Sequence, residues 1–314
     1  MLKNYFITAL RNLFRNKIYS FINIAGLSLG LACAMLIILY VKDEVSYDRF
    51  HKNLDNIYRL VAKGEMASPD GNQVRQMGIT GYVQGPKFTA TTPEIKSFVR
   101  VMHRTWDIKT RSDVQSQSIL IADSNFFSVF SFPLLEGNPK TALLSPNDVV
   151  ISEDIAKRQF GTKNALGKII VLKRDTQFIP FRVSGVAKRC PQNSSLQFEI
   201  VAPLQVPAGA EQTEYAWGQF MLVTYVVLTP NANAKVVDEK MKKTLENDPD
   251  ERIQKLFKQA KEQRASFSYM LQPFSKIHLD ADVSREDIYA ASDPIYSYIL
   301  SGIAFFILII ACIN

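Results

Sequence analysis

Two long apolar stretches lie near the ends of the chain, and apolar and polar residues alternate over short distances between them. The first stretch, Ile18 to Val41, holds no charged residue over 24 positions. A helix of that length rises about 1.5 Å per residue and reaches roughly 36 Å, more than the roughly 30 Å of a bilayer core. We therefore predict a transmembrane helix over residues 18–41.

The second stretch, Pro294 to Asn314, is also free of charge and rich in Ile, Phe and Leu, and Asp293 precedes it. We predict a second transmembrane helix over residues 294–314 that returns toward the side from which the first one came. A natural protein rarely ends inside a membrane without a charged flank. We therefore expect this helix to be truncated and the sequence to be the N-terminal part of a longer protein.

The first 17 residues have apolar positions at spacings of three and four, which is typical of one face of a helix. The residues on this face are Leu2, Phe6, Ala9, Leu10, Leu13 and Phe14. Beside a membrane span, such a helix is expected to lie in the cytoplasmic headgroup layer. We predict a cytoplasmic amphipathic helix over residues 1–17, with a disordered basic tail as the alternative.

The placement of charge predicts the orientation. The chain has a net charge of +7, of which the first 17 residues carry +4, so the rest of the chain has only +3. The four basic residues are Lys3, Arg11, Arg15 and Lys17. The positive-inside rule then places residues 1–17 in the cytoplasm and the residues after 41 outside. This is not the charge balance of a nucleic-acid-binding protein, so we expect no nucleic-acid partner.

The middle region, residues 42–293, combines short strand-like runs with helical ones, which predicts an α+β fold. The predicted strands are residues 57–62, 97–102, 118–122, 148–151, 168–172, 181–188, 196–202, 221–228 and 266–271. The predicted helices are residues 86–91, 125–130, 152–160, 232–245 and 249–264. Ser152 is the expected N-cap of the third helix, and Gly161 follows its end.

A loose helical stripe follows the first span and allows that helix to continue outward as a stalk. The apolar residues of this stripe are Val41, Val45, Phe50, Leu54 and Ile57.

The sequence contains no recognisable residue set for catalysis, metal binding or nucleotide binding. Cys190 is the single cysteine of the middle region, and His51, His103 and His278 are widely separated. The segment GTKNALGK, which begins at Gly161, has five residues between its glycines and no Ser or Thr after the lysine, so it departs from a phosphate-binding loop. We expect no catalytic residue, no metal, no cofactor and no disulfide in the middle region.

The first span contains the sequence GLSLG, with Gly26, Ser28 and Gly30. A serine-hydrolase nucleophile elbow needs a strand, a turn and a helix, and this serine lies inside an apolar helix. As GxxxG, the same residues form a surface where another membrane helix can approach closely. We take Gly26 and Gly30 as candidate helix-packing residues, and incidental small residues are the alternative.

The segment after the first span carries a specific motif, E-x-SYD-x-FH-x-N-x-D-x-IYR. Its residues in this chain are Glu44, Ser46, Tyr47, Asp48, Phe50, His51, Asn53, Asp55, Ile57, Tyr58 and Arg59. Together with the preceding IAGLSLG, it resembles the opening of ABC transporter permeases of the MacB/FtsX family. The resemblance implies a structural role for these residues.

The resemblance implies an extracytoplasmic α+β domain of two small α/β lobes, one inserted in the other, between two transmembrane helices. The segment from NDVVISEDIAKRQFG to SSLQFEIVAPL is similar to the inserted lobe. We place the periplasmic core domain at residues 42–293, the outer lobe at about 44–106 and 218–287, and the inserted lobe at about 107–217.

The resemblance also implies a function. The chain would be a non-catalytic permease subunit in a bacterial inner membrane, coupling ATP hydrolysis on a separate ATPase subunit to movement of its periplasmic domain. The expected partners are that ATPase, a second permease copy or half in a dimer, membrane lipid and a periplasmic adaptor. A two-pass sensor with a ligand-binding periplasmic domain has the same general layout and is the alternative. A membrane-anchored enzyme has no residue set in its favour.

Overall fold

A computed structural model describes residues 2–67, 71, 73–110, 113–213, 216–280, 282–283 and 292–313; for residues 2, 3, 8–10 and 12 it describes the backbone alone. The chain divides into two compact units. The helical unit comprises Met1–Ser46 and Ser292–Asn314, and the α/β unit comprises Tyr47–Ala291.

The helical unit contains three helices: α1 (Leu2–Arg15), α2 (Lys17–Glu44) and α8 (Pro294–Ile313). Both α2 and α8 are long and apolar enough to cross a membrane. The predicted helix over residues 1–17 stops at Arg15, because Asn16 has a non-helical backbone with φ −113° and ψ 58°. The first span is longer than predicted, since its helix includes Lys17 and runs to Glu44.

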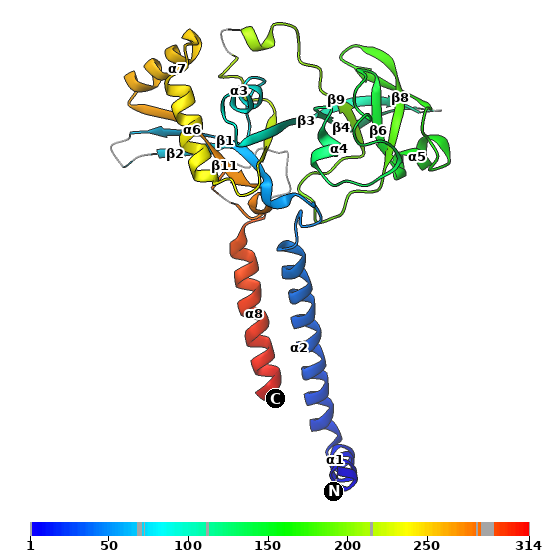
Figure 1. Cartoon of the computed structure of the whole chain (residues 1–314). Coiled ribbons are helices and arrows are strands. Elements are labelled where there is room, and N and C mark those ends of the chain that lie inside the picture. The colour runs from blue at the N-terminus through cyan, green and yellow to red at the C-terminus, as the bar shows by residue number, and fades with distance from the viewer. Residues whose placement is uncertain are drawn as a thin grey trace. The chain divides into compact units, whose positions relative to one another are not determined.

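Helices α2 and α8 pack side by side (Figure 1) through small residues. On α8 the buried positions are Ser297, Ala304 and Ala311, spaced by seven, and Ala34 is buried on α2. A seven-residue spacing keeps the same face of a helix turned toward its neighbour. Small side chains let the two backbones approach closely, which favours association where lipid supplies little hydrophobic drive.

The α/β unit contains eleven strands and five α-helices within the described residues. The strands are β1 (Ile57–Met66), β2 (Gln73–Met77), β3 (Ile95–Lys109), β4 (Val114–Ala122), β5 (Leu134–Gly137), β6 (Asp148–Ser152), β7 (Ile169–Arg174), β8 (Gln177–Ala187), β9 (Ile200–Pro203), β10 (Val223–Leu228) and β11 (Ala265–Pro273). The α-helices are α3 (Gln84–Thr91), α4 (Phe126–Val129), α5 (Glu153–Phe160), α6 (Ala234–Glu246) and α7 (Glu251–Glu262). Short 3₁₀ turns are η1 (Leu54–Asn56), η2 (Ala210–Gln212) and η3 (Phe274–Lys276).

The strands form one sheet in the order β11-β1-β10-β3-β4-β9-β6-β8-β5, with β2 paired to β1 and β7 paired to β3 and β8. Most neighbours are antiparallel, while β4–β9 and β6–β8 are parallel. Strand β3 pairs with β10 from Ile95 to Val101 and with β4 from Val101 to Lys109. The same strand therefore serves both halves of the sheet.

Three clusters of buried apolar side chains form the core. One packs α3, α6 and α7 against β1, β10 and β11, with Phe88 and Met241 at its centre. A second surrounds β6, β8 and α5, with Ile155 and Phe181. Figure 1 shows these two helix-covered parts of the unit, with α6 and α7 beside β1 and β11, and α5 beside β6 and β8.

The third cluster draws on both predicted lobes. It is rich in aromatic side chains, which include Phe126, Phe127, Phe130, Phe132, Phe198, Tyr225 and Phe274. The first five fall in the predicted inserted lobe, and the last two fall in the predicted outer lobe. The lobe boundaries remain a prediction, and this cluster lies across them.

Helix α5 confirms its predicted caps. The Ser152 hydroxyl accepts a hydrogen bond from the Ile155 N–H at 3.2 Å, and Gly161 ends the helix in the left-handed region at φ 70°. A Ser or Thr N-cap satisfies one of the free N–H groups of the first turn, and glycine adopts positive φ without strain.

The predicted stalk is wrong. Helix α2 ends at Glu44, Asp48 takes a left-handed backbone with φ 60°, and Ile57 begins a strand. Of the apolar residues in the loose helical stripe, Phe50, Leu54 and Ile57 pack in the aromatic-rich cluster of the α/β unit, whereas Val41 lies in α2 and Val45 is exposed. Sequence reasoning also missed β2 and β5, which are short and carry few fully buried residues.

Candidate functional site

Six of the eleven motif residues lie in the connecting segment between α2 and β1, which we call the motif loop (residues 47–56), and the other five flank it. Asp48 is its most buried acidic residue, with 1% of its surface exposed. Its Oδ1 accepts hydrogen bonds from the Ser195 N–H at 2.8 Å and the Ser194 hydroxyl at 3.4 Å. Its own N–H donates to the Asn193 carbonyl at 2.9 Å. Asp48 thus joins the loop to a segment about 146 residues further along.

The surroundings of Asp48 disfavour the charged form of its carboxyl group. Burial raises the pKa of the Asp48 carboxyl above its ordinary value, while hydrogen bonds from Ser195 and Ser194 and the nearby His278 act in the opposite direction. The backbone at φ 60° adds strain, although Asp tolerates this region better than most residues. A buried carboxyl group on a strained backbone is consistent with a specific structural role for Asp48.

His51 makes the second attachment. Its Nδ1 accepts a hydrogen bond from the Ser131 N–H at 3.0 Å, so Nε2 carries the ring proton. The Lys52 N–H donates to the Ser131 hydroxyl at 3.0 Å. His51 is also surrounded by aromatic rings, with centroid distances of 5.1 Å to Phe132 and 5.4 Å to Phe274. Two neighbouring residues of the loop are therefore fixed to one serine.

The apolar surroundings of His51 keep it neutral. Burial lowers the pKa of His51 to about 4, and Nε2 is buried without a hydrogen-bond partner among the described residues. A histidine in this state can pack as an aromatic ring. Proton transfer at neutral pH is not favoured by such a pKa.

Two further contacts fix the ends of the segment. The Tyr47 ring stacks on His278 with centroids 3.3 Å apart and an interplanar angle of 3°. Beyond the loop, Arg59 Nε donates to Gln272 Oε1 at 2.7 Å, and the Gln272 amide donates in turn to Asp280. The motif region is therefore tied to several segments of the α/β unit that are distant in sequence.

The remaining motif residues have local roles. Glu44 is the last residue of α2, and the Ser46 hydroxyl donates to the Asp43 carbonyl at 2.8 Å. Asn53 accepts a hydrogen bond from the Asn56 side chain at 2.8 Å. Phe50, Ile57 and Tyr58 contribute to the hydrophobic clusters. The structural role that the resemblance implies is consistent with these placements, and it stays a prediction.

The two candidate packing glycines are placed differently. A Cβ added at Gly30 would lie 3.1 Å from Ala311 Cβ and 3.5 Å from Ile307 Cγ2, so Gly30 faces α8 closely. Gly26 is exposed on α2. The structure brings one glycine of the pair to a helix contact and leaves the other on a free face of the helical unit.

Sequence reasoning missed the partners of the motif loop. Ser131, Ser194 and Ser195, and Gln272 lie 79 to 213 residues away from the motif residues that they bind. Serine and glutamine are common, and no spacing marks these positions, so a single sequence offers no signal for them. No group of three metal-ligating side chains occurs among the described residues.

Comparisons with known proteins agree on the class. A family profile described as MacB-like periplasmic core domain matches residues 20–244. A domain of a candidate permease protein from Porphyromonas gingivalis is 21% identical with a TM-score of 0.59, over 76% of this chain and 94% of that one. The comparison with curated proteins found no match.

Two further solved structures are more distant. The periplasmic region of MacB from Actinobacillus actinomycetemcomitans is 14% identical with a TM-score of 0.40, over 69% of this chain and 90% of that one. The extracellular domain of the noncanonic ABC-type transporter YknZ from Gram-positive bacteria is 16% identical with a TM-score of 0.40, over 61% and 94%.

The match to the family profile, together with two helices long and apolar enough to cross a membrane, places the chain in the ABC transporter permease class. The chain belongs to the MacB-like periplasmic core domain family, because the family profile covers most of its length. The resemblance stated from the motif is thereby confirmed, and so is the predicted α+β extracytoplasmic fold. Permease components of this class are not themselves catalytic.

Proposed function

We propose that the chain is a permease subunit that couples ATP hydrolysis on a separate ATPase subunit to movement of its periplasmic domain. The family membership supports a transport-type role and disfavours the two-pass sensor. The chain's own residues would bind no nucleotide in this mechanism. They would pass a change in the membrane helices on to the α/β unit.

One observation carries this proposal: the chain passes from membrane helix to anchored domain within three residues. Helix α2 ends at Glu44, and Asp48 is already buried and hydrogen-bonded to Ser195. His51 is fixed to Ser131 only three positions later. A flexible linker would absorb a helix displacement, whereas a short, anchored connection transmits it.

The proposal includes an orientation and a location. The basic residues before Ile18 favour a cytoplasmic N-terminus in a bacterial inner membrane, with the α/β unit in the periplasm. Helix α1 has exposed apolar side chains, including Phe6 and Phe14, together with Arg11 and Arg15. This composition suits a helix that lies in the lipid headgroup layer.

Further partners follow from the proposed mechanism. Closure of an ATPase pair acts on two permease halves, so we propose a dimer, and lipid surrounds α2 and α8. The exposed apolar residues of α2, such as Phe21 and Leu36, suit such surroundings. A periplasmic adaptor is a further proposed partner of the α/β unit.

The coupling is tested by lengthening the connection. A flexible Gly-Ser-Gly-Ser insertion between Ser46 and Tyr47 separates α2 from its first anchor, and spin labels on the α/β unit of the full-length protein report its movement on ATP addition. The measurement uses nanodiscs with the ATPase that co-purifies with the protein. We expect the insertion to abolish the nucleotide-dependent change in distance while ATP hydrolysis continues.

The matched control places the same insertion at the exposed turn between Asp175 and Thr176, which connects β7 and β8. This control should keep the nucleotide-dependent change. If the insertion at Ser46 leaves the movement intact, or no ATPase co-purifies, the coupling proposal is wrong.

A further inference from the structure

A cavity of about 450 Å³ opens on the α/β unit between the segment before β6 and the loop before β7. It is lined by Thr141, Leu144, Ser145, Asp148, Leu166, Gly167, Arg182, Val183 and Ser184. Its size falls in the range of sites for small ligands or for one or two peptide side chains. None of these residues belongs to the motif loop or to the aromatic cluster.

The polar part of the cavity is a fixed arginine. Arg182 Nε donates to Asp148 Oδ1 at 2.9 Å, Nη2 forms an ion pair with the same oxygen at 2.8 Å, and the Asp148 carboxylate is almost fully buried. The Arg182 side chain is itself 60% exposed, and its Nη1 has no hydrogen-bond partner among the described residues. The buried carboxylate therefore holds a guanidinium whose outer N–H groups are open to a ligand.

The apolar part of the cavity is a pair of leucines. Leu144 is 63% exposed and Leu166 is 53% exposed, although both line the same cavity. The backbone beneath Leu166 is held in place, because its N–H and that of Ala165 donate to Glu136 Oε2, each at 3.1 Å. These two exposed aliphatic side chains lie beside the charged Arg182 side chain, so the cavity is amphipathic.

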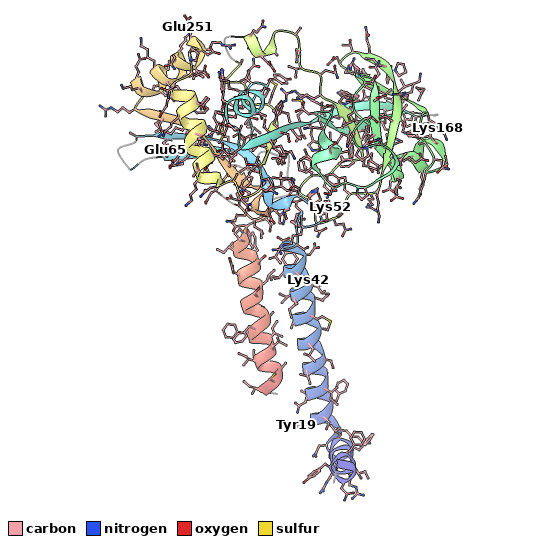
Figure 2. The ribbon with its side chains drawn as sticks, in the orientation of Figure 1. Tyr19, Lys42, Lys52, Glu65, Lys168 and Glu251 are labelled. Atoms are coloured by element: carbon pink, nitrogen blue, oxygen red, sulfur yellow. The ribbon has the colours of Figure 1, made fainter. Side chains whose placement is uncertain are left out.

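The surrounding charge favours an anion. Lys140 and Lys168 adjoin lining residues, and Lys168 is held with its Nζ 5.0 Å from the centre of the Phe160 ring. Figure 2 labels Lys168 in the part of the unit that contains α5, β6 and β8. With Arg182 there are three basic groups against the carboxylates of Asp148 and Glu136, an excess of one positive charge.

We propose that this cavity binds a polypeptide segment that presents a carboxylate next to an aliphatic side chain. The carboxylate meets the outer N–H groups of Arg182, and the aliphatic side chain packs between Leu144 and Leu166. Thr141 and Ser145 line the same cavity, and hydroxyl side chains suit the polar groups of a peptide backbone. A long acyl chain would need a longer apolar channel than these two leucines offer.

The test uses the full chain in lipid nanodiscs and three probes. The first is a fluorescein-labelled Gly-Ser peptide that ends in Leu-Leu with a free carboxylate, and the second is the same peptide with a C-terminal amide. The third is decanoate, added as a competitor. Fluorescence anisotropy should show that the carboxylate peptide binds about tenfold more tightly than the amide, since a charge-assisted hydrogen bond is lost in the amide.

Variants identify the site. Arg182→Gln and the double variant Leu144→Ser/Leu166→Ser should each weaken peptide binding about tenfold, while Lys157→Gln, an exposed basic residue on α5, should leave it unchanged. Arg182→Gln leaves Asp148 without its partner and can disturb folding. The leucine variant changes exposed side chains alone and keeps the test valid in that case.

Each remaining result would overturn the proposal. Equal binding of carboxylate and amide peptides would remove the role of Arg182. Wild-type affinity in the leucine variant would place any bound peptide elsewhere. Binding of decanoate without binding of the peptide would assign the cavity to a fatty acid instead.

Discussion

Single residues in the motif loop show how a polar motif can be structural. Asp48 combines a buried charge, a left-handed backbone and two side-chain hydrogen bonds, and His51 combines a neutral ring with an aromatic environment. In both cases the side chain accepts a hydrogen bond from a backbone N–H of a distant segment, which is buried at Ser195 and partly buried at Ser131. The polar atoms therefore select one way of joining these segments, which apolar packing alone would leave less defined.

Substitutions at Asp48 separate its hydrogen bonds from its charge. Asp48→Ala leaves the Ser195 N–H without an acceptor and puts alanine at φ 60°, so it should lower the free energy of unfolding by about 2–4 kcal/mol. Asp48→Asn keeps an acceptor oxygen and tolerates this backbone, so its effect at neutral pH should stay below about 1 kcal/mol. Denaturant unfolding of the full chain, followed by the fluorescence of Trp106 and Trp217, measures both.

The pH dependence gives a second comparison. Because the folded-state pKa of Asp48 is raised, the folded protein holds this proton more firmly, and wild-type stability falls relative to Asp48→Asn as pH rises above about 4. At lower pH, where the carboxyl is protonated in both states, the two proteins should converge. If Asp48→Asn is as unstable as Asp48→Ala at neutral pH, the charge itself is required.

At the scale of elements, the contact between α2 and α8 depends on small residues at matching positions. Gly30 and Ala34 on α2 meet a face of α8 that includes Ala304 and Ala311. Uninterrupted apolar runs predicted both helices as membrane spans, but they did not distinguish the two glycines of GLSLG. Their different environments follow from the direction in which α8 passes, which is a tertiary property.

Leucine at Gly30 should separate the two helices. Its Cβ alone would lie 3.1 Å from Ala311 Cβ, and three more carbon atoms have to fit behind it. Gly26→Leu is the matched control, because Gly26 is exposed and the span keeps the same added hydrophobicity. Oxidative cross-linking of Ala34→Cys with Ala304→Cys, in a chain without native cysteines, should fall severalfold in Gly30→Leu alone.

Cross-linking at the wild-type level in both variants would show that Gly30 does not govern the approach of α8. A loss in both would show instead that α2 uses Gly26 for a contact that the helical unit by itself does not contain. The second result would support the proposed dimer, where a further membrane helix covers the free face.

At the scale of the whole molecule, the α/β unit is one sheet that spans the two predicted lobes. Strand β3 pairs with β10 in its first half and with β4 in its second, and the aromatic cluster draws on both sides. The lobes are therefore expected to respond together when the motif loop is displaced. The proposed function also requires the α/β unit to lie on the periplasmic side of the membrane.

The orientation is tested by labelling single cysteines in a chain from which Cys33, Cys190 and Cys312 have been removed. Thr176→Cys, in the exposed turn between β7 and β8, should react with a membrane-impermeant thiol reagent in intact spheroplasts. Asn4→Cys should react only after permeabilisation, because the basic flank favours the cytoplasm. The reverse pattern would contradict the proposed topology.

The sequence by itself determined the features that depend on neighbouring residues. An uninterrupted apolar run predicts a membrane helix, and Ser152 and Gly161 mark the two ends of α5. The dense motif from Glu44 to Arg59 indicates the family. Each is a local pattern of polarity, capping or residue order, and local patterns act over one or two turns of chain.

Only the tertiary structure decided which distant groups meet. The acceptor role of Asp48 toward Ser195, the contact of Gly30 with α8, the pairing of β5 with β8 and the cavity beside Arg182 all join residues far apart in sequence. The end of α2 was decided in the same way, because burial of Ile57 in a strand outweighs a weak helical stripe. Differences in helix propensity change the free energy of folding by roughly tenths of a kcal/mol per residue, whereas burying a large apolar side chain contributes about 2 kcal/mol.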